Sequence, residues 1–185
     1  MINHKFFFDH VRTYLFSGKL TQPQVNRLNA ILNEWEKNYA KKDDRWLAYM
    51  LATTHHETDR TMQPIEEYGK GKGKLYGKPD PITGKAYYGR GFVQLTWKTN
   101  YEKMGKVLGA DLVNKPELAL NTAYATKILF YGMMNGSFTK KKLSDYFNAQ
   151  KEDWVNARRI INGLDKAHLI ADYAKQYYAA ISYTV

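Results

Sequence analysis

The sequence has 185 residues, of which 44% are hydrophobic and 15% aromatic, and it contains no cysteine. This length fits one domain with a sizeable core, and this composition excludes a disordered chain. The absence of cysteine excludes disulfides, thiolate metal sites and a cysteine nucleophile. The formal net charge of +10 favours an acidic partner such as nucleic acid, a membrane surface or bacterial cell wall.

The first 60 residues predict helices. The apolar run Phe6–Phe8 is followed at once by charged residues, so it is too short for a signal-peptide core. No stretch approaches the roughly 20 apolar residues of a membrane span. The segment Thr21–Gln24 is typical of a helix start with a capping box. After a polar turn at 41–44, we expect a second helix from about Arg45 to Thr58.

The segment 69–91 differs in composition, with seven glycines among prolines and lysines. It predicts a loop or a short β-hairpin, with a turn and strand at 82–88. The spacing GKGKG at 69–73 is a weak candidate for a phosphate loop, because no strand precedes it and no GK[ST] pattern follows.

Helical patterning returns in the second half of the chain. The expected segments are 100–108, 121–134, a helix that starts at the lysines 140–142, a helix at 154–161 that ends at Asn162-Gly163, and a last helix from Asp165. We therefore expect a mainly α fold with at most a small hairpin.

One carboxylate stands on the apolar face of the helix expected at 45–58. At 100° per residue, Trp46, Met50 and Glu57 lie within about 20° of one line. Burial and the negative end of the helix dipole both favour a protonated carboxyl there, which is the form that a general acid needs. The alternative is a salt bridge between Glu57 and a basic neighbour such as Arg90.

Two further carboxylates, Glu66 and Glu67, lie at the mouth of the glycine-rich loop. An acid on a helix that faces a carboxylate on a loop is the arrangement that glycoside hydrolysis needs. Ordinary loop charge is the alternative explanation of this pair.

A metal site is the competing interpretation of the histidines at 55 and 56. Adjacent residues on a helix point about 100° apart, and no HExxH motif is present. We therefore expect no metal, and we interpret His56 as a packed or hydrogen-bonding neighbour of Glu57.

Three segments carry a resemblance to a known family. HHET at 55–58 and YYGRGFVQLTWKTNY at 87–101 resemble the family 19 glycoside hydrolases, which include plant-type chitinases and phage endolysins. ARRIINGLDKAHLIADYA at 157–174 resembles the family's Asn-Gly segment and closing helix. The resemblance runs from about Ala48 to Tyr178. It implies a lysozyme-like helical fold, and the short, cysteine-free chain resembles the endolysin type.

The resemblance also implies roles for individual residues. Glu57 matches the general acid, and an aliphatic-x-Glu pattern from Ile65 favours Glu67 as the general base, with Glu66 as the alternative. Thr96 matches the hydroxyl that holds the attacking water. The residues implied at the sugar cleft are His56, Tyr88, Arg90, Gln94, Asn100 and Asn162. Packing and charge support are equal alternatives for Tyr88 and Arg90. The implied reaction is inverting hydrolysis of a β-1,4-linked N-acetylhexosamine polymer, without a cofactor.

Peptidoglycan is the expected substrate, because it is acidic and the chain is basic. We expect one catalytic domain over 1–185, with the helices at about 5–40 as a variable extension and no separate wall-binding module. We also expect a monomer without stable membrane insertion, although contact with an anionic outer-membrane surface stays open. The protein is expected to be made in the host cytoplasm without a signal peptide and to act after a holin opens the membrane.

Three other functions stay open. The first is a chitinase, since chitin shares the β-1,4 N-acetylhexosamine backbone. The second is a nucleic-acid-binding protein, which is disfavoured because the lysines gather in loops at 70–78 and 140–142 and no nucleic-acid-binding motif is present. The third is a non-catalytic wall-binding protein, against which the glutamates and Thr96 argue.

Overall fold

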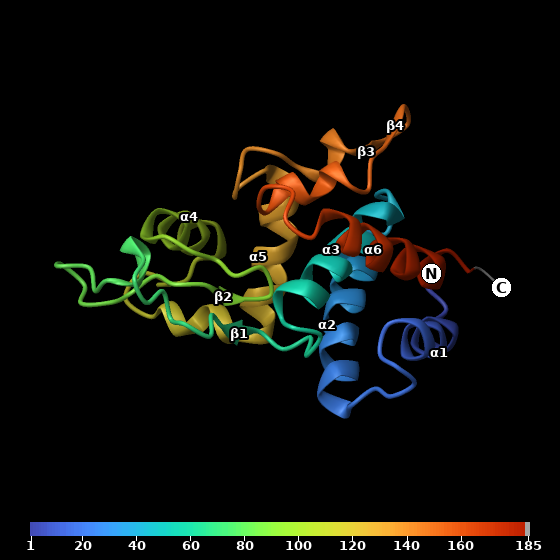
Figure 1. Cartoon of the computed structure of the whole chain (residues 1–185), viewed down its shortest axis with the longest axis horizontal. Coiled ribbons are helices and arrows are strands. Elements are labelled where there is room, and N and C mark those ends of the chain that lie inside the picture. The colour runs from blue at the N-terminus through green and yellow to red at the C-terminus, as the bar shows by residue number, and fades with distance from the viewer. Residues whose placement is uncertain (184–185) are drawn as a thin grey trace.

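The computed structural model describes residues 1–183, and this part of the chain is mainly helical (Figure 1). The α-helices are α1 (His4–Tyr14), α2 (Gln22–Asn38), α3 (Asp44–Glu57), α4 (Lys98–Leu108), α5 (Thr122–Asn135) and α6 (Ala167–Ser182). The short 3-10 helices are η1 (Leu75–Gly77), η2 (Pro116–Leu120), η3 (Leu143–Asp145) and η4 (Asn156–Ile160). The strands are β1 (Ile65–Glu66), β2 (Arg90–Gly91), β3 (Phe147–Asn148) and β4 (Lys151–Glu152). Within the described residues, no helix is both long and apolar enough to cross a bilayer.

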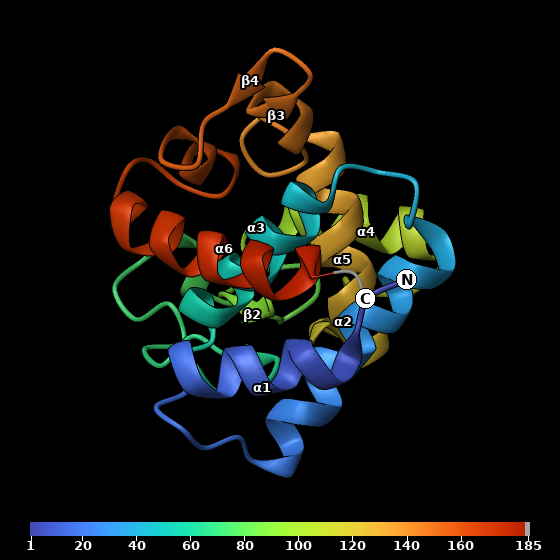
Figure 2. The same ribbon diagram turned by 90° about the vertical axis from the view of Figure 1, so that its right-hand side faces the viewer.

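Helix α3 is the centre of the core. Every residue from 47 to 55 is buried, which is the pattern of a helix covered on all sides. Its largest contact is with α6, which runs across it in Figure 2. Glu57 is the last residue of α3, so a rigid, buried helix positions its carboxyl group.

Local capping explains where the predicted helices begin. Thr21 and Gln24 form the expected capping box at the start of α2, with each side chain bonded to the other's backbone N–H. Asp43 caps α3, and Asn121 accepts from two backbone N–H groups of α5. These caps satisfy N–H groups that the helix leaves unpaired, so the predicted starts of α2, α3 and α5 hold to within a residue.

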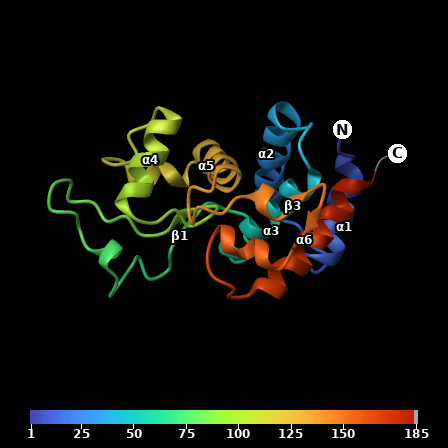
Figure 3. The same cartoon turned by 90° about the horizontal axis from the view of Figure 1, so that it is seen from above.

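The glycine-rich segment forms a long loop closed by a very short antiparallel pair. Strand β1 pairs with β2, and the loop between them projects away from α1 and α6 (Figure 3). The expected strand at 82–88 is wrong, since this stretch forms a turn and irregular chain. Within the loop, Gly71 and Gly77 are in contact, and a Cβ on Gly77 would overlap the Gly71 carbonyl. Of the three glycines in GKGKG, Gly71 is therefore the one that a close backbone crossing requires.

The region 140–166 departs most from the sequence prediction. The expected helix at 154–161 is only η4, the lysines 140–142 precede only η3, and the hairpin β3–β4 was not predicted. The reason is tertiary: the Arg158 side chain donates to the carbonyl of Asp165 and to the carboxylate of Glu57, which holds this stretch in a compact, non-α conformation. Lys166 has φ +56°, a left-handed conformation that delays the start of α6 from Asp165 to Ala167.

Candidate active site

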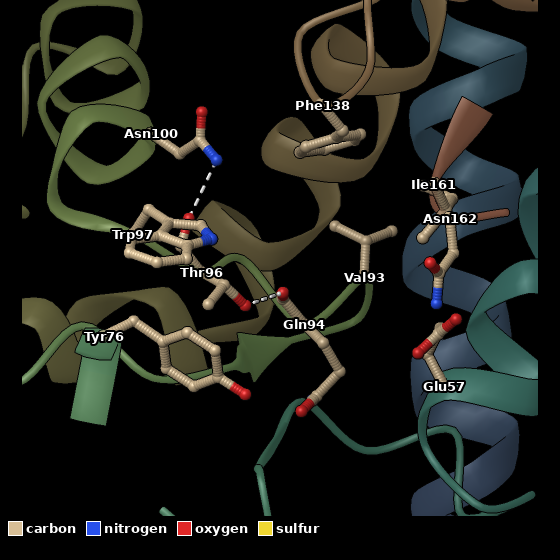
Figure 4. Close-up of a pocket in the computed structure, with 10 residues that line it drawn as sticks. All are labelled: Glu57, Tyr76, Val93, Gln94, Thr96, Trp97, Asn100, Phe138, Ile161 and Asn162. Atoms are coloured by element: carbon tan, nitrogen blue, oxygen red, sulfur yellow. Dashed lines mark hydrogen bonds between the residues drawn. The ribbon is translucent and has the colours of Figure 1, made fainter. Parts of the chain in front are cut away.

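A cleft of about 420 Å³ lies between the end of α3 and the segment that leads into α4. Figure 4 shows Glu57 and Asn162 on one side of it and Thr96, Trp97 and Tyr76 on the facing side. We call the first side, formed by Glu57, Ile161 and Asn162, the helix wall. The facing side is the loop wall, and its residues are Tyr76, Val93, Gln94, Thr96, Trp97 and Asn100. Two walls from distant parts of the chain thus enclose a groove with a carboxyl group on one side.

Glu57 is held by an arginine from the C-terminal part of the chain. Arg158 donates from Nη1 to Oε1 of Glu57 at 2.6 Å, and its side chain is only 3% exposed against 15% for Glu57. The alternative of a salt bridge between Glu57 and a basic neighbour is therefore what the structure shows, with Arg158 as the partner. Arg90, which we expected as the example of such a neighbour, contacts Glu66 instead. Arg158 is absent from the site residues expected from the sequence. The sequence signal for Arg158 was its position among the apolar residues of the segment 154–161. A buried arginine is nearly always paired with a carboxylate.

The two loop carboxylates have different partners. Glu67 accepts from two neutral donors: the Tyr76 hydroxyl at 3.1 Å and the Gly89 N–H at 3.1 Å. Both glutamates line a hollow of about 220 Å³ together with Glu57 and Gln94. Gln94 also lines the cleft. The hollow and the cleft share Glu57 and Gln94 in their linings, so Glu66 and Glu67 adjoin the loop wall.

Glu66 belongs to a network of cations. It accepts from the Tyr88 hydroxyl at 2.7 Å and lies 3.1 Å from Lys70 Nζ and 3.4 Å from Arg90 Nε. The Tyr88 hydrogen bond, with help from the two cations, lowers the pKa of Glu66 below its ordinary value. Glu66 is thereby fixed as a charged structural partner, whereas Glu67 bonds only to neutral groups and is the better candidate for a base.

Tyr88 and Arg90 support this network and line neither the cleft nor the adjoining hollow. The Arg90 guanidinium lies 3.7 Å from the centre of the Tyr88 ring, and Arg90 also donates to the Tyr101 hydroxyl at 3.1 Å. Both side chains hold the β1–β2 pair in place. Their contacts therefore match the packing and charge-support alternative.

Thr96, Gln94 and Asn100 come together in the loop wall. The Thr96 hydroxyl donates to the carbonyl of Gln94 at 2.7 Å, and Asn100 Nδ2 donates to the carbonyl of Thr96 at 2.8 Å. With its proton used in this way, the Thr96 oxygen keeps lone pairs that can accept from a water in the cleft. Gln94 Nε2 donates to the carbonyl of Ile65 at 3.1 Å, which connects this wall to the glutamate pair.

The two histidines separate in space. His56 lines the hollow beside Glu57, where burial lowers its pKa. His55 is fully buried, shares a hydrogen bond between Nδ1 and the Tyr177 hydroxyl at 3.0 Å, and plays no part in the cleft. No cluster of three metal-ligating side chains occurs within residues 1–183. Asn162 lines the cleft directly beside Glu57 (Figure 4).

The comparisons with known proteins agree with this architecture. Residues 37–150 match the family of glycoside hydrolase 19 enzymes described as chitinase class I. An acidic endochitinase of Petunia hybrida is 36% identical over 93 residues, which cover 49% of this chain and 36% of that protein. An inactive chitinase-like protein of Hevea brasiliensis is 38% identical over 80 residues, covering 40% of this chain and 26% of that protein. Chitinase C of Streptomyces griseus has the same fold, with a TM-score of 0.68 at 21% identity over 99% of this chain and 77% of that one.

The matched segment includes the end of α3, the glycine-rich loop and the loop wall, and it covers well over half of the chain. The chain therefore belongs to glycoside hydrolase family 19. It spans 26% and 36% of the lengths of the two curated relatives.

Proposed function

We propose that this protein hydrolyses β-1,4 glycosidic bonds of an N-acetylhexosamine polymer by an inverting mechanism. The observation that carries the proposal is that Glu57 and Glu67 line the same hollow beside the cleft, one from the end of a buried helix and one from a loop. Two carboxyl groups separated by room for a water are what an inverting glycosidase needs.

The roles follow from the partners of each group. Glu57 donates a proton to the leaving glycosidic oxygen, and Glu67 removes a proton from the attacking water. Thr96 accepts a hydrogen bond from that water and so fixes its direction. Arg158 holds the Glu57 carboxyl in place through Oε1, so the proton for the leaving glycosidic oxygen is carried on the other carboxyl oxygen. Asn162 and Asn100 lie at the cleft as amide groups that can bond to the N-acetyl substituents.

Peptidoglycan is the proposed polymer. It is polyanionic, and the chain carries a formal net charge of +10, which attracts such a substrate over a distance of about a Debye length. In this proposal the protein is an endolysin that is made in the host cytoplasm, acts as a monomer and breaks the wall after a holin has opened the membrane.

Chitin is the second candidate substrate. The matching relatives named acidic endochitinase and chitinase 3 favour it, and chitin has a β-1,4-linked N-acetylhexosamine backbone like that of peptidoglycan. A chitinase would use the same carboxylates, so the choice depends on groups outside the catalytic pair.

The products distinguish these substrates. Purified cell wall and a chitin hexasaccharide should each be digested, and the fragments analysed by mass spectrometry. The proposal expects soluble muropeptides with new reducing ends from the wall, and little cleavage of the hexasaccharide. The Glu57→Gln protein is the control for contaminating enzymes. Cleavage of the hexasaccharide alone would contradict the peptidoglycan assignment and favour the chitinase.

A further inference from the structure

A second hollow lies directly behind the loop wall. It has a volume of about 340 Å³ and is lined by Leu75, Lys78, Pro79, Pro81, Trp97 and Lys98, among others. Tyr76 and Trp97 line both this hollow and the cleft. The two cavities therefore share a pair of aromatic side chains, whose ring centroids lie 5.3 Å apart in an edge-on arrangement. We call this cavity the side hollow.

The backbone of Trp97 is held in a fixed position. Trp97 has φ +75°, a conformation that is strained for a bulky side chain and persists only where the surroundings impose it. The backbone N–H of Trp97 donates to the carbonyl of Tyr87 at 2.9 Å, and the carbonyl of Trp97 accepts from backbone N–H groups in the first turn of α4. The residue is nevertheless 48% exposed. Strain at an exposed tryptophan between two cavities points to a role in binding.

The lining of the side hollow combines apolar surface with one available positive charge. Leu75 is 71% exposed, and it lies beside two prolines in the lining. Lys98 is tied to Asp80 at 2.9 Å. Lys78 is exposed and forms no ion pair with the described residues. The chemistry fits a short peptide with small apolar side chains and free carboxylates.

We propose that the side hollow binds the acidic stem peptide of peptidoglycan while the glycan strand lies in the cleft. The inference rests on the proposed function and names the part of that substrate that chitin lacks. Because Trp97 and Tyr76 line both cavities, a substituent on a sugar in the cleft reaches the side hollow by passing these two rings. Lys78 pairs with a peptide carboxylate, and Leu75 and the prolines cover the alanine methyl groups.

A matched pair of charge reversals tests this. Lys78→Glu changes the rim of the side hollow, and Lys85→Glu makes the same charge change at an exposed lysine of the same loop that does not line it. The substrates are intact peptidoglycan and the same glycan stripped of its peptides by an amidase. We expect Lys78→Glu to lower kcat/KM on intact peptidoglycan by about 5-fold, the scale of lost and reversed exposed charge pairing, with no change on the stripped glycan. Lys85→Glu should change both substrates by less than about 2-fold.

Three results would overturn the inference. If Lys78→Glu lowers kcat/KM equally on both substrates, Lys78 contacts the glycan and not the peptide. If it lowers kcat/KM on neither substrate, Lys78 does not take part in binding. If Lys78→Glu and Lys85→Glu lower kcat/KM on intact peptidoglycan equally, the effect is general electrostatic attraction between the basic protein and the acidic substrate. Failure of the wild-type protein to cleave either substrate contradicts the proposed function itself, whereas cleavage without a selective Lys78 effect contradicts only the stem-peptide site. As a second variant, Leu75→Ala should show the same selectivity for the intact substrate.

Discussion

The two walls of the cleft are built in opposite ways. The helix wall stands on α3, whose residues 47–55 are all buried, and its glutamate is clamped by an arginine that is 3% exposed. The loop wall stands on a segment whose Tyr68 and Leu75 are 78% and 71% exposed, and hydrogen bonds and close glycine contacts hold it together. A rigid wall suits the acid, which must meet a bond of fixed geometry. The glycine-rich loop beside the loop wall has few buried residues, so it can adjust the base to the strand.

The largest effect should come from the rigid wall. Glu57→Gln keeps the shape and the hydrogen bond to Arg158 but cannot donate the proton. We expect the rate of wall hydrolysis to fall by at least ~10²-fold, the scale of a lost general acid. The melting temperature should stay close to that of the wild type. A folded Gln variant with full activity would remove Glu57 from the mechanism.

Beside the loop wall, the two adjacent glutamates should differ in their effect on catalysis. Glu67→Gln removes the proposed base and should lower kcat by about 10²-fold. Glu66→Gln breaks contacts with Tyr88, Lys70 and Arg90, so it should act mainly on stability and lower kcat by less than about 10-fold. Steady-state kinetics and thermal melts on both variants measure this. The reverse order would make Glu66 the base, and two active variants would place the base elsewhere.

The loop scaffold itself should matter less than its carboxylate. Gly77→Ala places a methyl group against the Gly71 carbonyl, so the crossing must open and Tyr76 must shift with it. We expect kcat/KM to fall by about 10-fold, because small displacements of positioning groups are costly, with a nearly unchanged melting temperature. Gly69→Ala is the matched control, since a Cβ there meets nothing within 4 Å. Equal activity of the two variants would show that the crossing is irrelevant to the site.

Substitution of His55, in the core behind the helix wall, should have the smallest effect on activity and a clear effect on stability. Burial lowers the pKa of His55 to about 4 from 6.5. Between these pH values the unfolded chain binds a proton that the folded chain does not, so stability is full above pH 6.5 and declines as the pH falls toward 4. The free energy of unfolding falls through this residue by about 3 kcal/mol at most.

Urea unfolding at pH 7 and pH 4.5 measures this dependence. His55→Gln retains a polar partner for Tyr177 and should flatten the decline, whereas His168→Gln, at an exposed position of α6, should leave it unchanged. An equally steep decline in the His55 variant would assign the acid sensitivity to other groups.

The difference between the walls also explains what the sequence could predict. The starts of α2 and α3 depend on side chains one to three positions away, such as Thr21, Gln24 and Asp43, so local chemistry was sufficient. The position of Glu57 on an apolar face followed from helical geometry alone. The partner of Glu57 lies 101 residues along the chain, and no local pattern pairs the two residues. The same long-range contact shortens η4, which is why the helix expected at 154–161 was wrong.

The pair Glu66 and Glu67 marks the limit of sequence reasoning at the site. The aliphatic-x-Glu pattern favoured Glu67 but left Glu66 as an alternative, and the fold gives the two residues different partners: a tyrosine and two cations for Glu66, a tyrosine and a backbone N–H for Glu67. Likewise, the motif that contains Tyr88 and Arg90 indicated the family, but it did not show that these two side chains hold the β1–β2 pair in place.

The stereochemistry of the product tests the central claim most directly. If Glu57 and Glu67 act from opposite walls with a water between them, a β-linked substrate must give an α anomer first. Their carboxyl groups should then lie roughly 6.5–9.5 Å apart in a substrate complex, against about 5–5.5 Å for a retaining enzyme. Proton NMR during the first minutes of hydrolysis, before mutarotation, reads the anomer. We predict the α signal first, and a β signal first would contradict the two-wall inverting mechanism.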